Sequence, residues 1–292
     1  MYRKVVGNPH LILYHTSVVL RIVKTSAKRL ISIQQITEVS KMSIEVIEVE
    51  NLPIIQPGDD LAGLISERIA LLDGDILCVA SSVYSKSVGN IRSLDEITPS
   101  PEAGRIASMT REDPRFVQAV LDSSVEIILD HPFILSRLAS GHIGVRAGVD
   151  HSNVEDGIVI LLPADPMGAA EAIRSEILEK TGVDIRVILT DTCGRAFRRG
   201  QTGHAIGWSG MTAIRDFRGD HDLFGHELLI TEEAVADEIA GFANFVMGES
   251  NKGVPAVVFR NMGSWSGHDM LYFEESEDII KEALKKRGYV SI

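Results

Sequence analysis

The sequence has few cysteines and no long hydrophobic run. Its two cysteines, Cys78 and Cys193, lie far apart and form no CxxC pair, which excludes a zinc signature of that kind and a disulfide framework. A reduced cytoplasm is the simplest location for such a protein. The most apolar stretch, residues 11–23, is shorter than the ~18 residues that a membrane span requires, and it contains an arginine. We therefore expect a cytoplasmic protein with no membrane partner.

The common nucleotide-binding and hydrolase signatures are also missing. There is no GxxxxGK(S/T) loop, no GxGxxG after the first predicted strand and no GxSxG elbow. Residues 226–230 nearly match the HExxH zinc motif, but Ile230 takes the place of the second histidine. Cys193 has no histidine or lysine beside it that would activate a thiolate, so we interpret it as a small loop residue.

Acidic residues outnumber basic ones. The formal net charge is −12, which argues against a surface that binds nucleic acid. With 292 residues, 45% of them hydrophobic, the chain is long enough for one large domain or two ordinary ones with a sizeable core.

The first 41 residues differ from the rest because they hold seven basic residues and a single acid, Glu38. A targeting peptide would be basic with a short apolar region, but no A-x-A-like cleavage site is evident. A genuine added arm is a second interpretation. We favour a third, in which Met42 is the natural start. We predict that residues 1–41 are a poorly ordered extension with no role in the chemistry, and that residues 42–292 form the body.

Hydrophobic periodicity, helix caps and turn residues predict a loose alternation of strands and helices. We expect strands at residues 43–49, 75–80, 125–129, 141–149, 157–162, 183–190 and 254–260, and an irregular one at 203–214. We expect helices at residues 59–72, 101–109, 114–121, 165–180, 231–247 and 275–287. Asp59 or Asp60 is the expected N-cap of the first, Asp165 opens the fourth and Gly182 closes it, and Thr231 begins the fifth. This order predicts an α/β or α+β fold with a mixed sheet.

The most informative stretch follows the predicted strand at residues 183–190. An acid and a hydroxyl, Asp191 and Thr192, stand where that strand is expected to end, the usual place for ligands in open α/β sheets. Three arginines follow between two glycines: Arg195, Arg198 and Arg199. Acid and hydroxyl oxygens suit magnesium or manganese, and arginine suits phosphate. The stretch predicts phosphoryl transfer or nucleotide-driven ligation; the alternative is a solvated turn whose arginines pair with surface carboxylates.

Three further polar clusters fall near predicted strand or helix ends. They are residues 150–153, residues 247–253, and the group of Ser81, Ser82 and Lys86. Together with Asp191 they offer three carboxylates, which could hold two divalent ions beside nucleotide phosphates if the clusters converge in space. Each cluster alone is also consistent with a turn cap or a solvated surface. His204 is either a contact for an anionic substrate or a structural histidine.

An ordered series of motifs resembles the coenzyme F420-0:L-glutamate ligase family, the gamma-glutamyl ligases, over about residues 42–260. The motifs are LPI at 52–54, GDDL at 58–61, SK at 85–86, FVQAVL at 116–121, AGVDHSNVE at 147–155, TDT at 190–192, GRAFRRG at 194–200, AIG at 205–207, VADEIA at 235–240 and MGE at 247–249. Two residues depart from the family pattern: Asn51 stands where we expect Gly, and Cys193 where we expect Asn. The flavin-reductase-like domain of actinobacterial versions is absent, so the chain resembles the single-module archaeal type.

The resemblance implies a GTP-dependent ligase. GTP phosphorylates a terminal carboxylate of the deazaflavin coenzyme precursor, and the amine of L-glutamate attacks the acyl phosphate to form an amide. A second round adds a further, gamma-linked glutamate. Family members use two Mg²⁺ or Mn²⁺ ions per site and are helped by K⁺. They fold as two interleaved α/β subdomains and pair into an intertwined homodimer, with the site near the subunit interface.

The resemblance also implies site residues. Asp150 and Asp191 match positions that hold one metal ion, and Thr192 and Glu249 match those that hold the second. The matching nucleotide-binding positions are Leu52, Pro53, Ile54, Ile55, Ser81, Ser82, Lys86, Asn153, Met247, Gly248, Glu249, Ser250, Asn251, Lys252, Gly253 and Val254. We assign catalytic roles to Asp150, Asp191 and Arg195. As a hypothesis, the three arginines named above contact the triphosphate or the phosphodiester of the substrate.

Two alternatives from other classes remain open. A metal-dependent phosphatase of the haloacid-dehalogenase type also has an apolar strand that ends in an acid, as at Asp191, but it needs a second acid where Cys193 stands. It predicts hydrolysis without glutamate. A non-catalytic nucleotide-binding module predicts nucleotide binding without a product.

Overall fold

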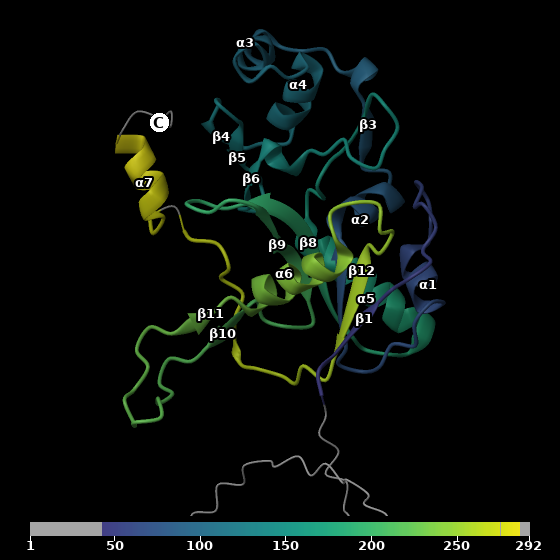
Figure 1. The fold of residues 1–292 in the computed structure, drawn as a ribbon, viewed down its shortest axis with the longest axis vertical. Coiled ribbons are helices and arrows are strands. Elements are labelled where there is room, and N and C mark those ends of the chain that lie inside the picture. The colour runs from purple at the N-terminus through teal and green to yellow at the C-terminus, as the bar shows by residue number, and fades with distance from the viewer. Residues whose placement is uncertain (1–42, 275, 287–292) are drawn as a thin grey trace, which may run out of the picture. The chain divides into compact units, whose positions relative to one another are not determined.

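Figure 1 shows the fold in a computed structural model, which describes residues 43–274 and 276–286. The expectation for residues 1–41 lies outside the described residues. The largest sheet has five strands, of which β2 and β8 are parallel while the other neighbours are antiparallel, so the predicted mixed sheet is confirmed. In spatial order the strands are β1 (Glu45–Glu48), β12 (Ala256–Arg260), β2 (Ile76–Ala80), β8 (Arg186–Gly194) and β9 (Gln201–Ser209).

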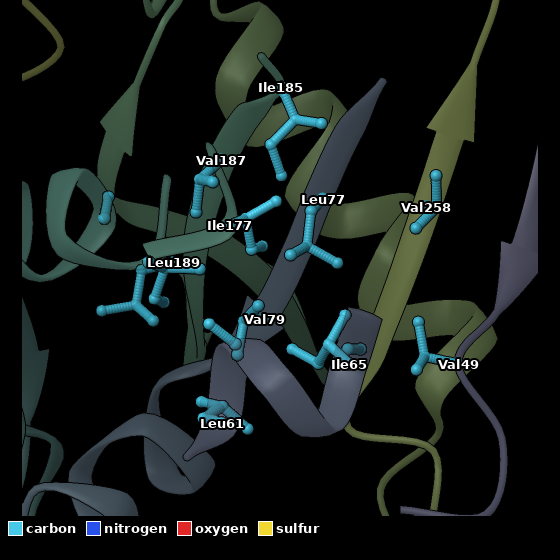
Figure 2. Close-up of a cluster of buried hydrophobic side chains, with 14 of the residues drawn as sticks. Val49, Leu61, Ile65, Leu77, Val79, Ile177, Ile185, Val187, Leu189 and Val258 are labelled. Atoms are coloured by element: carbon cyan, nitrogen blue, oxygen red, sulfur yellow. The ribbon is translucent and has the colours of Figure 1, made fainter. Parts of the chain in front are cut away.

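Both faces of this sheet are apolar and covered by helices. In β2, Leu77 and Val79 belong to one buried cluster, and Ile76 and Cys78 to the cluster on the other face. Because successive residues of a strand point to opposite faces, a strand that is apolar at every position is expected to be buried on both. Figure 2 shows the first cluster. The covering helices are α1 (Leu61–Ser66) and α5 (Pro166–Thr181) on that face and α6 (Val235–Met247) on the other.

Local capping explains where α5 begins and ends. The Asp165 side chain accepts a hydrogen bond from the backbone N–H of Gly168 at 2.9 Å, and Pro166 occupies the first turn. Gly182 ends the helix in a left-handed conformation, with a φ of 73°. The predicted helix and its closing glycine are both confirmed.

The predicted helix at residues 59–72 is shorter than expected, because α1 ends at Ser66. Its start is as predicted, with Asp60 as the N-cap. Beyond the end of the helix, the Arg68 side chain donates to the backbone carbonyls of Leu64 and Asn51, which satisfies these acceptors without a further helical turn.

A smaller core lies between residues 91 and 160. Its buried members include Phe116, Val117, Ile134 and Val149, and Leu162 packs against both this core and the α5 face of the large sheet. Its elements are β3 (Ile91–Ser93) paired with β7 (Ile158–Ile160), the antiparallel set β4 (Glu126–Leu129), β5 (Leu135–Arg137) and β6 (Ile143–Val145), the helices α3 (Pro101–Thr110) and α4 (Pro114–Asp122), and the short turns η1 (Leu94–Glu96) and η2 (Arg146–Gly148).

The predicted strand at residues 141–149 and the predicted helix at 231–247 differ from the structure. β6 stops at Val145 because Arg146 and Ala147 take positive φ values of 56° and 53°, which a strand does not allow. Helix α6 begins only at Val235, because residues 232–233 form β11. The small third sheet consists of β11 (Glu232–Glu233), β10 (Ile214–Asp216) and β13 (Gly267–His268).

The prediction that a strand ends at Thr190 is wrong. β8 continues through Asp191 to Gly194 and pairs with β9, including Asp191 opposite His204 and Thr192 opposite Gly203. Two elements complete the description: α2 (Ser81–Ser87), which follows β2 directly, and α7 (Ile279–Lys286). Among the described residues, no helix is long and apolar enough to cross a membrane.

The packing of α5 on β9 predicts a large cost for one added methyl group. A Cβ at Gly207 would lie 2.1 Å from the carbonyl oxygen of Pro166, so Gly207→Ala should destabilise the fold by roughly 1–3 kcal/mol. A Cβ at Gly194, also in the β8–β9 ladder, would meet nothing within 4 Å. Gly194→Ala should therefore stay within about 0.5 kcal/mol of the parent. Urea midpoints by circular dichroism compare the two; equal midpoints would refute the close approach.

Candidate active site

A large cleft lies between the five-stranded sheet and the smaller core. Its volume is about 1360 Å³, which exceeds the roughly 300–1,000 Å³ of a pocket for a single small molecule. The cleft therefore has room for a nucleotide together with a second substrate. Its walls come from the segment after β1, the start of α2, the segment from β6 to β7, the far half of β8, and the end of α6 with the following loop.

Asp191 lies at the floor of this cleft because of the register of the two parallel strands. Ala80 at the end of β2 is paired with Thr190 of β8. The residues that follow them, Ser81 and Asp191, are therefore neighbours. The Ser81 hydroxyl donates to Oδ1 of Asp191 at 3.3 Å.

Asp150 enters the cleft from the smaller core. Its backbone exchanges hydrogen bonds with Ile160, at 3.0 and 2.7 Å, which fixes the segment against β7. Its carboxylate accepts from the backbone N–H of Ser152 at 2.9 Å and also from the Ser152 hydroxyl. From the side of the large sheet, the Lys86 ammonium donates to the carbonyl oxygen of Asn153. This contact ties α2 to the loop that carries Asp150.

Thr192 and Glu249 meet on the other side of β8. The Thr192 hydroxyl donates to Oε1 of Glu249 at 3.0 Å, and the side-chain amide of Asn244 donates to both partners. Asn244 lies on α6, and Glu249 follows that helix after Gly248, which has a φ of 75°. The glycine allows the chain to turn back toward β8 there.

The carboxylates of the cleft repel one another. Loss of hydration raises the pKa of Asp191 to about 7, and the negative charges of Asp150 and Glu249 act in the same direction. Hydrogen bonds from Ser81 and from the Thr192 backbone oppose this rise only in part. The Asp191 side chain keeps a partial opening to solvent, but surrounding protein atoms displace most of its water.

Lys86 supplies positive charge to the same cleft. Burial lowers its pKa, and the nearby Asp150 carboxylate offsets part of that effect. Its ammonium donates to a backbone carbonyl oxygen rather than to a carboxylate.

The three acids and the Thr192 hydroxyl therefore present hard oxygen donors, a set that fits a divalent cation such as Mg²⁺ or Mn²⁺.

The structure brings most of the predicted site residues into one lining. They are Leu52, Pro53, Ile54, Ile55, Ser81, Ser82, Lys86, Asp150, Asn153, Asp191, Thr192, Met247, Gly248, Glu249, Ser250, Asn251, Gly253 and Val254.

Lys252 is absent from this lining, because its ammonium donates to Glu48 at 2.7 Å and to the carbonyl oxygen of Val246 at 2.6 Å. The three arginines of the predicted site, Arg195, Arg198 and Arg199, also lie outside the lining. Arg195 donates to the carbonyl oxygen of Gly200 at 3.3 Å, near the exposed tip of the β8–β9 hairpin. The catalytic assignment of Arg195 and the phosphate contacts of Arg198 and Arg199 stay predictions. His204 lines a separate, smaller pocket.

Arg146 and Asn244 are among the lining residues that the sequence analysis did not assign to the site. Arg146 forms an ion pair with Glu112 and lies over the ring of Phe116 at 5.7 Å, and it enters the cleft through its positive φ. Asn244 orients Thr192 and Glu249 from α6. Neither residue stands in a recognisable motif. The one available signal for Asn244 is its position in the last turn of a helix that ends at a polar loop.

The cysteine in the cleft is not a thiolate. Cys193 is 8% exposed, and burial raises the pKa of its thiol. A buried neutral thiol is a poor nucleophile. The absence of an activated nucleophile here agrees with the interpretation of Cys193 from sequence.

Comparisons with known proteins agree on one family. Residues 50–261 match the family described as F420-0:Gamma-glutamyl ligase. The chain is 51% identical over 247 residues to the protein named Coenzyme F420:L-glutamate ligase of Archaeoglobus fulgidus, covering 84% of this chain and 99% of the relative. Proteins of the same name from Haloarcula marismortui and Methanosarcina mazei are 46% and 43% identical, over 85% and 84% of this chain and 99% and 98% of theirs. The whole cleft lining falls inside the matched residues.

The raised pKa of Asp191 predicts a pH-dependent stability of the metal-free protein. The folded-state pKa of about 7 exceeds the unfolded value of ~3.9, so the free energy of unfolding falls as pH rises toward 7. Asp191→Asn should then raise Tm at about pH 8 in EDTA, because it increases the free energy of unfolding by at most about 4 kcal/mol. This gain in stability should be smaller at about pH 5.5, where Asp191 is mostly protonated.

The control is Asp216→Asn. Arg218 holds the pKa of Asp216 down to about 2, so this substitution should lower Tm at both pH values. Thermal unfolding by circular dichroism measures both variants. A lower Tm for Asp191→Asn at about pH 8 would show that the ionised Asp191 carboxylate does not destabilise the metal-free fold.

Proposed function

Because the chain belongs to the F420-0:gamma-glutamyl ligase family, we propose that it joins L-glutamate to a carboxylate of coenzyme F420-0, and then adds a further, gamma-linked glutamate. One observation carries the proposal. Asp150, Asp191, Thr192 and Glu249, which come from both cores and from three segments of the sequence, meet in a single cleft large enough for two substrates.

The proposed reaction proceeds in two steps. The γ-phosphoryl group of GTP moves to the substrate carboxylate, which releases GDP and leaves an acyl phosphate. The amine of L-glutamate then attacks the acyl carbon, the C–N bond forms and phosphate departs. The first step is needed because a free carboxylate has no good leaving group. The protein needs no covalent nucleophile for this chemistry, since phosphoryl transfer depends on positioning and electrostatic stabilisation.

Divalent cations fit the oxygen donors of this cleft. We propose that Asp150 and Asp191 hold one Mg²⁺ or Mn²⁺ ion and that Thr192 and Glu249 hold a second, with K⁺ as a further activator. Such ions supply neutralisation of the charge on the transferring phosphoryl group. The raised pKa of Asp191 supports the assignment, because a bound cation would offset both the loss of hydration, which is the larger cause, and the repulsion from Asp150 and Glu249.

The chain's own residues position the nucleotide in this proposal. Ser81 and Ser82 begin α2 at the cleft floor, where their hydroxyls and the Lys86 ammonium offer donors to phosphate oxygens. The loop at residues 247–254 closes the opposite wall. Gly253, with a φ of 71°, lets the backbone of that loop turn close to the ligand.

The two alternative functions are less well supported. The phosphatase needs a second acid where the buried neutral thiol of Cys193 stands. The non-catalytic module leaves unexplained why three acids are assembled at a cost in stability, since nucleotide binding alone does not require them.

We also propose that the chain forms a homodimer. The segment between β10 and β11 projects from the body in Figure 1 and exposes four large apolar side chains. They are Leu223, Phe224, Leu229 and Ile230. On α6, Phe245 is 80% exposed. Apolar patches of this kind on soluble proteins mark association surfaces.

The proposed reaction is tested by mass spectrometry of F420-0 incubated with the protein, GTP, Mn²⁺ and L-glutamate. We expect a mass gain of one or more glutamyl units and a matching amount of GDP. Asp191→Asn should lower kcat at least about 100-fold, because it removes charge at the transferring phosphoryl group. Asp216→Asn lies outside the cleft lining and should keep the parent rate. GDP without a mass gain would indicate the phosphatase, and bound nucleotide with neither product would indicate the module.

The proposed homodimer predicts a sedimentation velocity consistent with twice the chain mass of 31.9 kDa. Ile230→Glu places a charge on the projecting segment and should shift the protein to monomer, since an unpaired charge is costly in an apolar interface. Leu72→Glu, at an exposed apolar residue on another part of the body, serves as the control. A parent protein that sediments as a monomer would contradict the proposal.

A further inference from the structure

Three polar side chains form a tight triangle on the side of β8 that faces α6. The Thr192 hydroxyl oxygen lies 3.0 Å from Oε1 of Glu249. The side-chain amide nitrogen of Asn244 lies 3.0 Å from that hydroxyl and 2.5 Å from the same carboxylate oxygen. The proposed reaction assigns the second divalent ion to Thr192 and Glu249, but it gives Asn244 no part in holding it.

The triangle has the dimensions of a metal site. Neighbouring ligands of an octahedral Mg²⁺ ion, each ~2.0–2.1 Å from the ion, lie about 2.9 Å apart. Two sides of the triangle match this spacing, and the third is somewhat shorter. The same distances are ordinary hydrogen-bond lengths, so a change from hydrogen bonding to ion binding requires little movement of these three side chains.

The close approach of α6 to the strand pair fixes the position of Asn244. Gly203 of β9 is paired with Thr192, and it has no side chain. A Cβ at Gly203 would lie 2.6 Å from Cβ of Asn244 and 2.5 Å from the carbonyl oxygen of Ala240. A larger residue would therefore push the helix away from β9. The glycine allows the helix to hold the Asn244 amide against Thr192.

The hydrogen bonds of the triangle use the lone pairs that an ion needs. Oε1 of Glu249 accepts from both Thr192 and Asn244, which fills its two lone pairs. An ion bound to Oε1 and to the Thr192 oxygen must displace the amide N–H groups, because a donor hydrogen cannot face a cation. Rotation of the Asn244 amide by about 180° puts its oxygen where its nitrogen was, and this oxygen is an acceptor that can bind the ion.

The same face of β8 carries a buried hydroxyl without a partner. Thr190 precedes Thr192 by two residues and so lies on the same side of the strand. It is 4% exposed and lines the cleft, and its hydroxyl makes no hydrogen bond within the part of the chain that the structure describes. Because buried polar atoms are nearly always hydrogen-bonded, this hydroxyl calls for a partner from outside the chain, such as water that a bound ion holds.

We propose that Asn244 is a third protein ligand of the second divalent ion, through its side-chain carbonyl oxygen. This inference rests on the proposed function, which places that ion at Thr192 and Glu249. One carboxylate, one hydroxyl and one amide make a set of hard oxygen donors that suits Mg²⁺ or Mn²⁺. The remaining positions around the ion are left for water and phosphate oxygens, as is usual for Mg²⁺ in nucleotide sites.

A neutral third ligand makes the two ion positions unequal. Asp150 and Asp191 offer two carboxylates to the first ion, whereas Glu249 offers the second ion only one. Because affinity for such cations depends on the number of charged ligands, the second ion should bind more weakly than the first. It also keeps more of its positive charge for the transferring phosphoryl group.

The first test counts the Mn²⁺ ions bound by the protein, with and without GDP, from the electron paramagnetic resonance signal of the free ion. The parent should bind two ions with different affinities. Asn244→Leu should weaken the weaker site at least about tenfold and leave the tighter site nearly unchanged. The control is Gln118→Leu, which removes another helix amide that donates to a carboxylate, that of Asp122, outside the cleft. It should change neither site.

Asn244→Asp serves as the second variant, in case the leucine variant does not fold. It keeps an oxygen at the same position and adds a negative charge, so it should bind the second Mn²⁺ ion more tightly than the parent. If Asn244 acted only as a hydrogen-bond donor to Glu249, the aspartate would lose that bond and repel Glu249. Weaker binding of the second ion to Asn244→Asp would therefore overturn the inference.

A crystal structure of the parent with Mn²⁺ tests the contact directly, because anomalous scattering locates the ion. We expect an ion about 2.0–2.3 Å from Oδ1 of Asn244. An ion bound to Glu249 with the Asn244 amide beyond about 3 Å would show that Asn244 only orients its neighbours, and would overturn the inference.

The inference and the proposed function can fail separately. If the parent adds glutamate to F420-0 but Asn244→Leu binds both Mn²⁺ ions as the parent does, Asn244 is not a ligand and the proposed function stands. If the parent forms no product, the proposed function fails, whereas loss of the weaker Mn²⁺ site in Asn244→Leu would still support Asn244 as a ligand. A parent that binds fewer than two Mn²⁺ ions, with and without GDP, would overturn the inference whatever its activity.

Discussion

The parallel pairing of β2 with β8 is the constraint on which the cleft depends. Its register sets Ala80 opposite Thr190, so Ser81 and Asp191 meet at one edge of the sheet. Beyond that edge the segments that follow the two strands diverge, because β2 is followed directly by α2 while β8 continues as a hairpin with β9. The divergence opens the space to which the smaller core and the loop after α6 each add a wall. Ligand sites at the carboxyl ends of parallel strands arise from this geometry.

The acids of the cleft are held in place by structure that does not itself bind ligand. Ile188 and Leu189, which precede Asp191, are fully buried on opposite faces of the sheet, so the strand cannot shift to relieve repulsion at its far half. Natural proteins accept unfavourable electrostatics at sites of function when the surrounding core supplies the stability. Asp191, with its raised pKa above an apolar strand, is an instance of this balance.

Features decided by neighbours along the chain could be predicted from sequence. The caps Asp60, Asp165 and Gly182 act where they were expected, because cap geometry is local. The errors occur where a distant segment overrides a local signal. Residues 232–233 follow a good N-cap residue but pair with β10, and Asp191 looked like the end of a strand until its pairing with β9 was known.

The candidate site was predictable for a different reason. Its clusters are separate along the chain, and only the resemblance to a family indicated that Asp150, Asp191 and Glu249 belong together. Arg146 and Asn244 could not be found this way, because their roles depend on a positive φ and on the direction of a helix face. The ion pair that turns the Lys252 ammonium away from the cleft could not be predicted from sequence either, since its partner Glu48 lies on the distant strand β1.

The alternation of contacts along β8 limits which sequence changes the cleft can tolerate in evolution. Asp191 contacts Ser81 on one side of the strand, and Thr192 contacts Glu249 on the other. Inserting or deleting one residue ahead of them would exchange the two sides and dismantle both groups at once. The hairpin tip at residues 195–200 is exposed and carries no such penalty. The strand before the tip can therefore accept substitutions but no change of length, and this constraint of register does not extend to the tip.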